Sequence, residues 1–321
     1  MVNPKRASDR PERTPVVMVA GAINTDLVAR CLVAPGPGET VTGHDFAIFG
    51  GGKGANQAFA VARSGVATAM LGAVGADDFG RARLADLTAE GIDVSHVAPR
   101  SDIASGVALI MVDESGENRI LYVPGPTLTI SVNDVERAMA AARPDLILMT
   151  LEPPVEVLER LMSIAERANV PVILNATPEP DAGRAIAARV QVLIVNETEA
   201  CQLLGIELGR EEWPEVVRRL LATGPETVVA TLGDQGAIVG SGDRIETFPA
   251  PSVEVIDTTG AGDAFCGAFV ARLARGDDPV TAAMYGVAAG TLAVTIAGAQ
   301  PSIPRSEEIQ IVLDSLLDEN E

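Results

Sequence analysis

Residues 257–265 read DTTGAGDAF, in which small residues stand between two aspartates. Gly260, Ala261 and Gly262 would leave backbone N–H groups unobstructed where a helix begins, and such an N-terminus favours an anion. Asp263 would then lie beside that anion as a base. Phosphoryl transfer needs both groups, because the donors hold the equatorial oxygens and the carboxylate accepts the proton of the attacking hydroxyl. The plain alternative is a helix cap, in which Asp263 contributes about 1 kcal/mol.

A second glycine-rich segment, GGKGAN, covers residues 51–56 at an expected helix start. It does not fit a P-loop, since Gly54 follows Lys53 where serine or threonine is needed. No GxGxxG fits between a strand and a helix, so a dinucleotide site is also unsupported. The segment is either a glycine turn, or a close backbone approach to a hydroxyl-rich ligand with Lys53 and Asn56 as donors.

A third segment, NETE, covers residues 196–199 after a predicted strand. Asn196 and Glu199 have the spacing of a capping box. They are also a sensible ligand set beside a hydrated Mg²⁺, which takes few protein oxygens together with waters and substrate phosphates. Both interpretations remain open from this segment alone.

The composition restricts the class of protein. The 321 residues are 47% apolar, which is enough for a sizeable core. The net charge of −20 opposes binding to nucleic acid or to anionic membranes. Three scattered cysteines favour a reducing, cytoplasmic compartment over disulfides or thiolate metal sites. With only two histidines, a histidine zinc site or a serine–histidine triad is not expected.

Two segments bear on targeting and membrane insertion. Residues 1–15 are polar and charged with no apolar core, so we expect a flexible tail and not a secretory signal. Residues 279–304 carry no charge and could span a bilayer by length. They are rich in alanine, glycine and threonine, and we expect a helix buried in the protein.

The elements that must position the three segments alternate along the chain. Apolar runs typical of buried strands occupy residues 16–24, 68–75, 145–152, 171–178 and 190–199, with a strand pair at 227–240. Helical spacing occupies 53–66, 79–92 and 154–169, and further helices follow residue 260 and cover 281–295. This alternation predicts an α/β fold with a parallel sheet covered by helices on both faces. Residues 25–52 and 105–125 indicate strands and turns of a separate small lid.

The three segments occur together with NTD (24–26), PGETVTG (37–43), TLGDQG (231–236) and GAQPSIP (298–304). In this order and spacing the chain resembles the ribokinase-like (PfkB) family of carbohydrate kinases, from about residue 16 to about residue 305. The resemblance implies a three-layer α/β/α sandwich with a mostly parallel central sheet and a β-sheet lid. It implies one kinase domain over residues 16–310, a lid from segments near 25–51 and 104–125, and a helix end with an acidic tail at 311–321.

The activity implied by the resemblance is ATP-dependent phosphorylation of the primary hydroxyl of a pentose, foremost D-ribose at O5. Another sugar is the alternative: deoxyribose, a ketohexose, a keto-deoxy sugar acid or a nucleoside, although the low aromatic content disfavours a nucleoside. A non-catalytic sugar- or nucleotide-binding protein is a further alternative, which the intact Asp263 opposes. The implied cofactors are ATP with Mg²⁺ and a monovalent cation, K⁺. The implied partners are the sugar, ATP and a second subunit clasped through the lid.

Carried over by position, Asp263 is the catalytic base, and Gly260, Ala261 and Gly262 form the anion hole. The implied sugar ligands are Asn24, Asp26, Gly51, Gly52, Lys53, Asn56 and Glu152, with Asp263. Taken singly, Asn24 and Asp26 fit an Asx turn equally well, and Glu152 fits the end of a strand. The implied ATP ligands are Asn196, Thr231, Gly233, Asp234, Gln235, Gly236 and Gly262, where a simple strand–turn–strand is the alternative.

Metal positions carried over in the same way fall into two groups. Asn196 and Glu199 serve Mg²⁺ through water. The monovalent-cation ligands are Asp257, Thr259, Ala293, Ile296, Gly298 and Ser302, mostly through backbone carbonyls. The chain departs from the family pattern at Pro126 and Thr127, where an Ala-Asn pair is common, so the details of the lid differ there.

Overall fold

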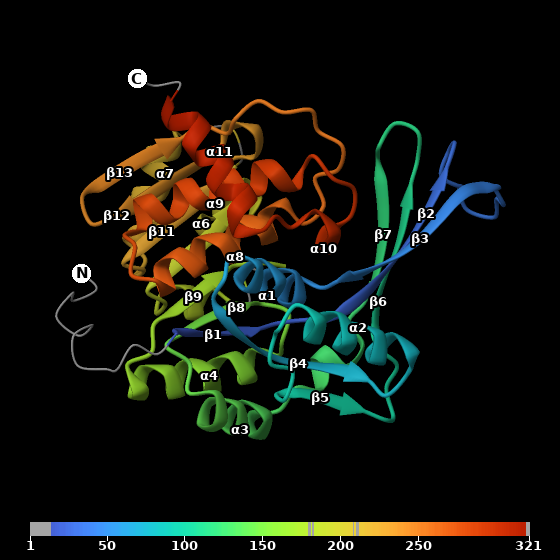
Figure 1. The fold of residues 1–321 in the computed structure, drawn as a ribbon, viewed down its shortest axis with the longest axis horizontal. Helices are drawn as coiled ribbons and strands as arrows, with labels where there is room; N and C mark the ends of the chain where they lie inside the picture. The colour runs from blue at the N-terminus through green and yellow to red at the C-terminus, as the bar shows by residue number, and fades with distance from the viewer. Residues whose placement is uncertain (1–13, 179–180, 182, 208, 210–211, 319–321) are drawn as a thin grey trace.

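The computed structural model describes residues 14–178, 181, 183–207, 209 and 212–318 (Figure 1). Its main sheet has nine strands in the order β13-β12-β11-β10-β9-β8-β1-β4-β5. The strands are β1 Val16–Ala20, β4 Ala67–Gly75, β5 Val97–Arg100, β8 Leu146–Thr150, β9 Val172–Asn175, β10 Val192–Asn196, β11 Thr227–Thr231, β12 Ala237–Ser241 and β13 Arg244–Phe248. Pairing is parallel from β5 to β11 and antiparallel at β12 and β13.

Helices cover both faces of this sheet, as its apolar strands require. On β1, Val17 and Val19 pack on one face while Met18 and Ala20 pack on the other. The first face carries α1, α8 and α9, and the second carries α3, α4, α6 and α7 (Figure 1). The helices are α1 Lys53–Arg63, α2 Asp78–Ala89, α3 Val132–Ala142, α4 Val155–Ala168, α5 Arg184–Ala187, α6 Glu197–Leu204, α7 Trp213–Leu221, α8 Ala261–Ala274, α9 Pro279–Ala293, α10 Ala299–Ser302 and α11 Ser306–Asp318.

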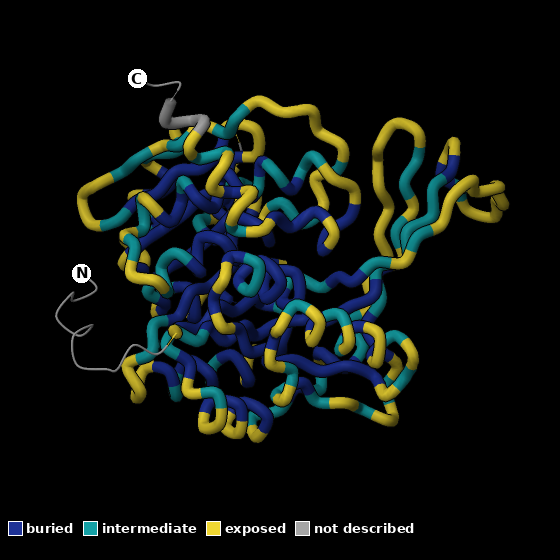
Figure 2. The backbone as a smooth tube through the Cα atoms, in the orientation of Figure 1, coloured by how far each residue is buried: buried dark blue, intermediate teal, exposed yellow. Residues whose placement is uncertain are grey.

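A second sheet of four strands projects from one side of the molecule (Figure 1). Its order is β3-β2-β6-β7, with β2 Asn24–Cys31, β3 Gly43–Gly51, β6 Gly106–Val112 and β7 Asn118–Val123. The β2–β6 pair is parallel and the two outer pairs are antiparallel. Most of this sheet is exposed or half-buried, in contrast to the buried main sheet (Figure 2). We refer to it below as the lid sheet.

The predicted α/β fold with a lid is confirmed. The uncharged stretch 279–304 supplies α9, most of which is buried against α8 and the sheet. Within the described part of the chain, every helix is too short or too polar to cross a membrane. Of the predicted tail at 1–15, only Thr14 and Pro15 belong to the described residues.

Helices α3 and α7 and strands β5 and β13 were not predicted from the sequence. Helix α3 begins with a reciprocal capping box between Ser131 and Asp134, a signal that the sequence does contain. Helix α7 begins with Trp213-Pro214 and buries Val216, Val217 and Leu220 at helical spacing. Both helices cover the face of the sheet opposite α1 and α8.

Candidate active site

The candidate site forms where α1 and α8 begin. These helices cross closely because Gly267 on α8 has no side chain, and an added Cβ would lie 2.6 Å from the backbone oxygen of Gln57 on α1. The close approach places Asp263, in the first turn of α8, against the first turn of α1. Two segments that are far apart in the sequence therefore meet at one point.

The carboxylate of Asp263 is held by two side-chain amides from α1. Asn56 donates its Nδ2 hydrogen to Oδ2 of Asp263 at 2.9 Å, and Gln57 donates from Nε2 to Oδ1 at 2.9 Å. The same Nε2 of Gln57 also donates to Oδ1 of Asn175, at the end of β9, at 2.8 Å. Asp263 is 8% exposed. Each of its oxygens keeps a free lone pair, so the group can still accept a proton from a ligand.

The N-terminus of α8 is open. Its cap residue is Gly260, at φ 81°, and no side chain caps the helix. A Cβ on Gly260 would lie 2.9 Å from Cα of Ala299, whereas a Cβ on Gly262 would meet nothing within 4 Å. Asp263 therefore does not act as the cap that the sequence alone allowed. The N–H of Ala261 donates to the backbone oxygen of Thr258 at 3.3 Å. The open space beside Gly262 leaves the helix start accessible, which suits an anion.

Three buried amide oxygens at the site have no partner among the described residues. They are Oε1 of Gln57, Oδ1 of Asn24 and Oδ1 of Asn56. Asn24 lies on β2 beside Gly106, whose missing side chain leaves room for its amide. An unsatisfied buried amide oxygen costs free energy unless a ligand hydroxyl donates to it. The oxygens of Asn24 and Asn56 are suited to the hydroxyls of a sugar, and the Asx-turn alternative for Asn24 does not describe what the structure shows.

Asp26 lies on β2, and its side chain reaches Gly51 at the start of the glycine segment. Its carboxylate occupies the space that a Cβ on Gly51 would need. Burial raises the pKa of Asp26 to about 6, against the opposing attraction of Arg83 and with a further upward contribution from the charge of Asp263. Asp26 and Asp263 therefore face one site from the lid sheet and from α8.

Glu152 organises the glycine segment. Its Oε2 accepts the backbone N–H of Ala22 at 2.8 Å, the N–H of Gly54 at 3.1 Å and the hydroxyl of Thr150 at 2.9 Å. Its Oε1 accepts only the N–H of Lys53, at 3.2 Å. Burial raises the pKa of Glu152, although these hydrogen bonds oppose the rise. Oε1 retains acceptor capacity for a ligand, while Oε2 holds the start of α1 in place.

Gly52 and Lys53 complete the sugar side. Gly52 has φ 89°, and a Cβ there would lie 2.6 Å from the backbone oxygen of Ala22, so only glycine fits. Burial lowers the pKa of Lys53, but the charges of Asp263, Glu152 and Glu199 outweigh it and raise the pKa. Lys53 is thus a firmly protonated cation among three carboxylates.

Asn196 and Glu199 form the capping box that the sequence allowed. Glu199 N–H donates to Oδ1 of Asn196, and Asn196 N–H donates to Oε2 of Glu199, both at 2.9 Å. Burial raises the pKa of Glu199, opposed by hydrogen bonds from Asn196 and Thr177 and by Lys53. Among the described residues, no three His, Cys, Asp or Glu side chains gather to hold a metal by themselves. One amide and one carboxylate fit Mg²⁺ only as a site completed by water and phosphates.

The predicted ATP segment forms the strand–turn–strand that was the plain alternative. Thr231 ends β11 in register with Asn196 at the end of β10, so both lie at one edge of the sheet. Gly233, Asp234 and Gln235 form an exposed turn of 3₁₀ helix before β12. Gly236 follows at φ 90°, packed against the backbone oxygen of Phe248. The segment thus borders the same edge as the capping box.

The predicted monovalent-cation residues lie on the 257–259 segment and between the end of α9 at Ala293 and the end of α10 at Ser302, and the side chain of Asp257 joins the two segments. Oδ1 of Asp257 accepts the N–H of Thr259 and Oδ2 accepts the N–H of Gly298, both at 2.9 Å. Burial raises the pKa of Asp257, but these bonds outweigh it and the pKa lies below its usual value. Ser302 donates its hydroxyl to the backbone oxygen of Ala299 at 2.8 Å.

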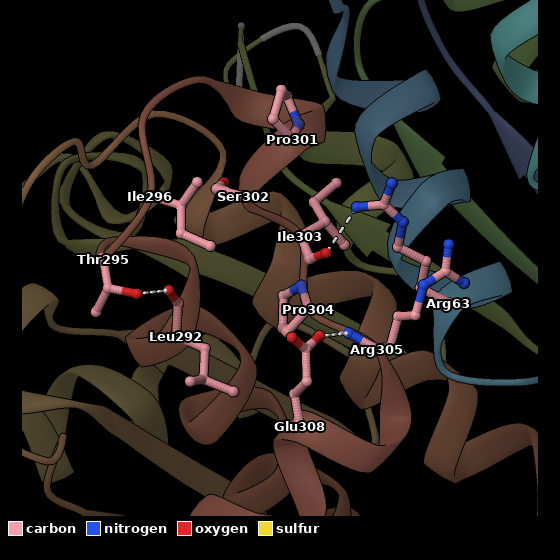
Figure 3. Close-up of a pocket in the computed structure, with 10 residues that line it drawn as sticks. All are labelled: Arg63, Leu292, Thr295, Ile296, Pro301, Ser302, Ile303, Pro304, Arg305 and Glu308. Carbon is pink, nitrogen blue, oxygen red and sulfur yellow. Dashed lines mark hydrogen bonds between the residues drawn. The ribbon is translucent and has the colours of Figure 1, made fainter.

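A cavity of about 300 Å³ adjoins these loops (Figure 3). Arg63 donates from Nη1 to the backbone oxygens of Gln300 at 2.8 Å and Ile303 at 2.7 Å, which fixes α10. Ile296 and Ser302 line the cavity and Ala293 does not. The lining residues are Arg63, Leu292, Thr295, Ile296, Pro301, Ser302, Ile303, Pro304, Arg305 and Glu308. None of them is among the residues that surround Asp263.

Sequence reasoning missed four residues of the site: Gln57, Asn175, Arg83 and Tyr122. Gln57 directly follows the GGKGAN segment, and its place in the first helical turn was the available signal. In the lid sheet, Asp26 on β2 pairs with Ala108 on β6, and Ala108 pairs with Tyr122 on β7. The side chains of Asp26 and Tyr122 therefore point to the same face of the sheet. Burial raises the pKa of Tyr122 to about 12, helped by Glu152 and Asp26 and opposed by a hydrogen bond with Asn24.

Comparisons with known proteins agree with this geometry. The profile of the pfkB family of carbohydrate kinases matches residues 15–306. A ribokinase of Haemophilus influenzae is 36% identical over 292 residues, covering 90% of this chain and 95% of that protein. A ribokinase structure from Thermotoga maritima has a TM-score of 0.84 at 31% identity, covering 94% of this chain and all of that one. An Arabidopsis thaliana ribokinase complexed with ribose and ATP has a TM-score of 0.83 at 28% identity, covering 94% and 98%.

Proposed function

The chain belongs to the pfkB family of carbohydrate kinases, and from this premise we propose that it transfers the γ-phosphoryl group of ATP to the O5 hydroxyl of D-ribose. The observation that carries the proposal is the pairing of Asp263 with an uncapped helix N-terminus at Gly260–Gly262. A base and an anion site at one helix start are the two elements that phosphoryl transfer requires.

In the proposed reaction, Asp263 accepts the proton of the sugar hydroxyl as its oxygen attacks the γ-phosphorus in line. The bond from that phosphorus to the β–γ bridging oxygen breaks, and ADP and ribose 5-phosphate leave. Asn56 and Gln57 keep the Asp263 carboxylate oriented by their hydrogen bonds. The N–H groups of residues 260–262 hold the phosphoryl oxygens, and each preorganised donor can supply about 3 kcal/mol.

The sugar would lie between the lid sheet and α1. Asn24, Asp26, Gly51, Gly52, Lys53, Asn56 and Glu152 are its proposed ligands. The buried, unpartnered amide oxygens of Asn24 and Asn56 support this placement. Closure of the lid over the sugar would exclude water, which would otherwise hydrolyse ATP.

ATP would lie along the edge formed by Asn196 and the 231–236 turn, with its phosphates toward Gly262. The proposed ligands are Asn196, Thr231, Gly233, Asp234, Gln235, Gly236 and Gly262. Asn196 and Glu199 would hold Mg²⁺ through water, and the ion, when bound, neutralises charge on the phosphates. We also propose a K⁺ ion bound by Asp257, Thr259, Ala293, Ile296, Gly298 and Ser302, which is supported by the bond from Gly298 N–H to Asp257 that joins the two segments carrying them.

We propose further that the lid sheet pairs two subunits. Strand register places Ile48, Leu109 and Leu121 on the face opposite Asp26, together with Phe46 and Met111. These five side chains are 36% to 61% exposed. An apolar face of this kind is typical of an interface, and a second copy offers the matching surface. The three cysteines are buried and none of them forms a disulfide, which fits our proposal of a reducing cytoplasm.

The function is tested by measuring ADP release with a panel of sugars, with and without K⁺. The proposal expects the largest kcat/KM for D-ribose, with 2-deoxyribose, a ketohexose, a keto-deoxy sugar acid and a nucleoside as competing substrates. If one of these sugars had a larger kcat/KM than ribose, that sugar would be the proposed substrate, and the protein would still be a sugar kinase. Sugar binding without turnover of any sugar would support a non-catalytic binding protein and contradict the proposal.

A further inference from the structure

Arg83 joins helix α2 to both lid strands that flank the sugar site. Its Nη1 donates to Oγ1 of Thr25 on β2 at 3.1 Å and to the backbone oxygen of Phe49 on β3 at 2.9 Å. Its Nε donates to Oδ2 of Asp86, one turn further along α2, at 3.0 Å. The Arg83 side chain is only 10% exposed. One guanidinium therefore fixes the root of the lid sheet to the main domain.

The two residues that Arg83 holds are the immediate neighbours of Asp26. Thr25 precedes Asp26 in the chain, and Phe49 lies directly opposite Asp26 in the β2–β3 pair. The guanidinium thus bonds to the side chain of Thr25 and to the backbone of Phe49, the two neighbours of Asp26. It does not occupy the face of Asp26 that is turned toward the sugar. A cation in this place determines both where Asp26 lies and which charge state it prefers.

The charges that face Asp26 come from three elements. Arg83 on α2 favours the carboxylate, Asp263 on α8 disfavours it, and Tyr122 lies on the same face of the lid sheet from β7. Asp86, which pairs with Arg83, is 45% exposed and belongs to α2. Arg83 is thus the cation that opposes the burial of Asp26. Without it, a larger fraction of Asp26 would be protonated near neutral pH.

We propose that Arg83 is a positioning residue for sugar binding, which holds the root of the lid sheet and keeps Asp26 charged so that it can accept sugar hydroxyls. The inference rests on the sugar-kinase function proposed above. Arg83 touches neither the sugar nor the phosphate in this account and acts through Asp26. A protonated carboxyl has fewer acceptor sites than a carboxylate, so sugar affinity would fall as Asp26 takes up a proton.

The test compares Arg83→Gln with Arg83→Lys. Glutamine keeps a hydrogen-bond donor for the lid strands but removes the charge, whereas lysine keeps the charge and loses the planar fork. We measure kcat/KM for ribose at saturating MgATP from pH 5.5 to pH 9. The acid limb of Arg83→Gln should move up by about one pH unit, which is about a fivefold loss of kcat/KM at pH 6, and kcat/KM should approach a plateau above pH 8.

The acid limb of kcat/KM in Arg83→Lys should lie at the same pH as in the wild type. This holds even if the plateau value of kcat/KM differs between the two proteins. Asp86→Asn is a second control, because it leaves in place both hydrogen bonds from Arg83 to the lid strands. The acid limb of its kcat/KM should also lie at the same pH as in the wild type. A merely structural role would lower kcat/KM of Arg83→Gln equally at every pH. That result, an unshifted acid limb, would overturn the inference.

A second measurement needs no substrate. The carboxyl ¹³C signal of Asp26, assigned with Asp26→Asn, is titrated by NMR in the ligand-free wild type and in Arg83→Gln. The inference expects a higher pKa of Asp26 in the variant, and an equal pKa would overturn it. If the wild type turned over no sugar, the proposed function would fail while this titration still decided whether Arg83 controls the charge of Asp26.

Discussion

The side-chain amide of Asn56 lies 2.9 Å from the carboxylate of Asp263, although the two residues are 207 positions apart in the chain. Gln57 makes the corresponding bond to the other carboxylate oxygen. The first turn of α1 thus orients a side chain in the first turn of α8. Asn56 is also a proposed sugar ligand through its unpartnered Oδ1, whereas Gln57 donates to Asp263 and to Asn175 and leaves its own buried Oε1 without a partner among the described residues.

Gln57→Leu should lower kcat with little effect on the KM for sugar. The substitution removes a bond that orients Asp263 but removes no proposed sugar ligand, and a misoriented group costs about tenfold to a hundredfold in rate. Steady-state kinetics with ribose gives both constants. The matched variant Asn56→Leu should raise KM as well as lower kcat. Unchanged kcat in Gln57→Leu would show that Asp263 needs no support from Gln57.

Gly262→Ala and Gly260→Ala should have opposite effects on stability. Gly262 lies in a helix with open space around it, so alanine should stabilise the protein by about 0.5 to 1 kcal/mol. Its new methyl group would obstruct the phosphate, and kcat/KM for ATP should fall about tenfold or more. Gly260 has φ 81° and contacts Ala299, so alanine there should destabilise by about 1 to 3 kcal/mol.

The stability of Gly262→Ala and Gly260→Ala is measured by chemical denaturation, and their kcat/KM for ATP by steady-state kinetics. Unaltered kinetics for ATP in a well-folded Gly262→Ala would contradict the placement of phosphate beside residue 262. Equal stability of both variants would contradict the packing of Gly260 on α10.

Asp26→Asn should stabilise the protein in a pH-dependent way. Burial raises the pKa of Asp26 from 3.8 in the unfolded chain to about 6 in the folded protein. The folded state therefore binds the proton more tightly, and the wild type loses stability as pH rises from about 4 to about 6. Above that window the variant should be more stable by about 1 to 2 kcal/mol, after allowance for partial solvent exposure.

The free energy of unfolding of both proteins is measured at pH 4 and pH 7.5. Asp45→Asn, an exposed change on the neighbouring lid strand, is the control. A stability difference between wild type and Asp26→Asn that does not grow with pH would contradict the burial of this carboxylate.

Leu121→Lys should convert the proposed dimer to monomers. Leu121 is 61% exposed on the lid face opposite Asp26, and a buried lysine there would have no partner. The adjacent variant Ile120→Lys lies on the other face and should keep the dimer. Light scattering after size-exclusion chromatography gives the mass of each. A wild-type monomer, or a Leu121→Lys dimer, would contradict an interface on this face.

The fold and the chemical segments were predictable because they are local. Continuous apolar runs such as 145–152 indicated buried strands, and the glycines of DTTGAGDAF indicated an open helix start. The capping box at Asn196 and Glu199 was also visible as a pattern, and the structure confirms that geometry.

Side-chain contacts between residues that are distant in the sequence were not predictable. Gln57 gains its importance from Asp263 and Asn175, which are 206 and 118 positions away. Arg83 looks like an exposed helical arginine in the sequence, yet its target is the root of the lid sheet. Such contacts depend on how α1, α2 and α8 pack, and a single sequence carries no signal for that packing.

The central claim is that Asp263 is the base in ATP-dependent phosphorylation of ribose. The most direct test is the turnover of Asp263→Asn, measured by ADP release with ribose, alongside calorimetric binding of ribose to the same variant. Asparagine keeps the shape and an acceptor oxygen but cannot take the proton. We predict that nearly all turnover is lost while ribose still binds. Turnover close to that of the wild type would contradict the account.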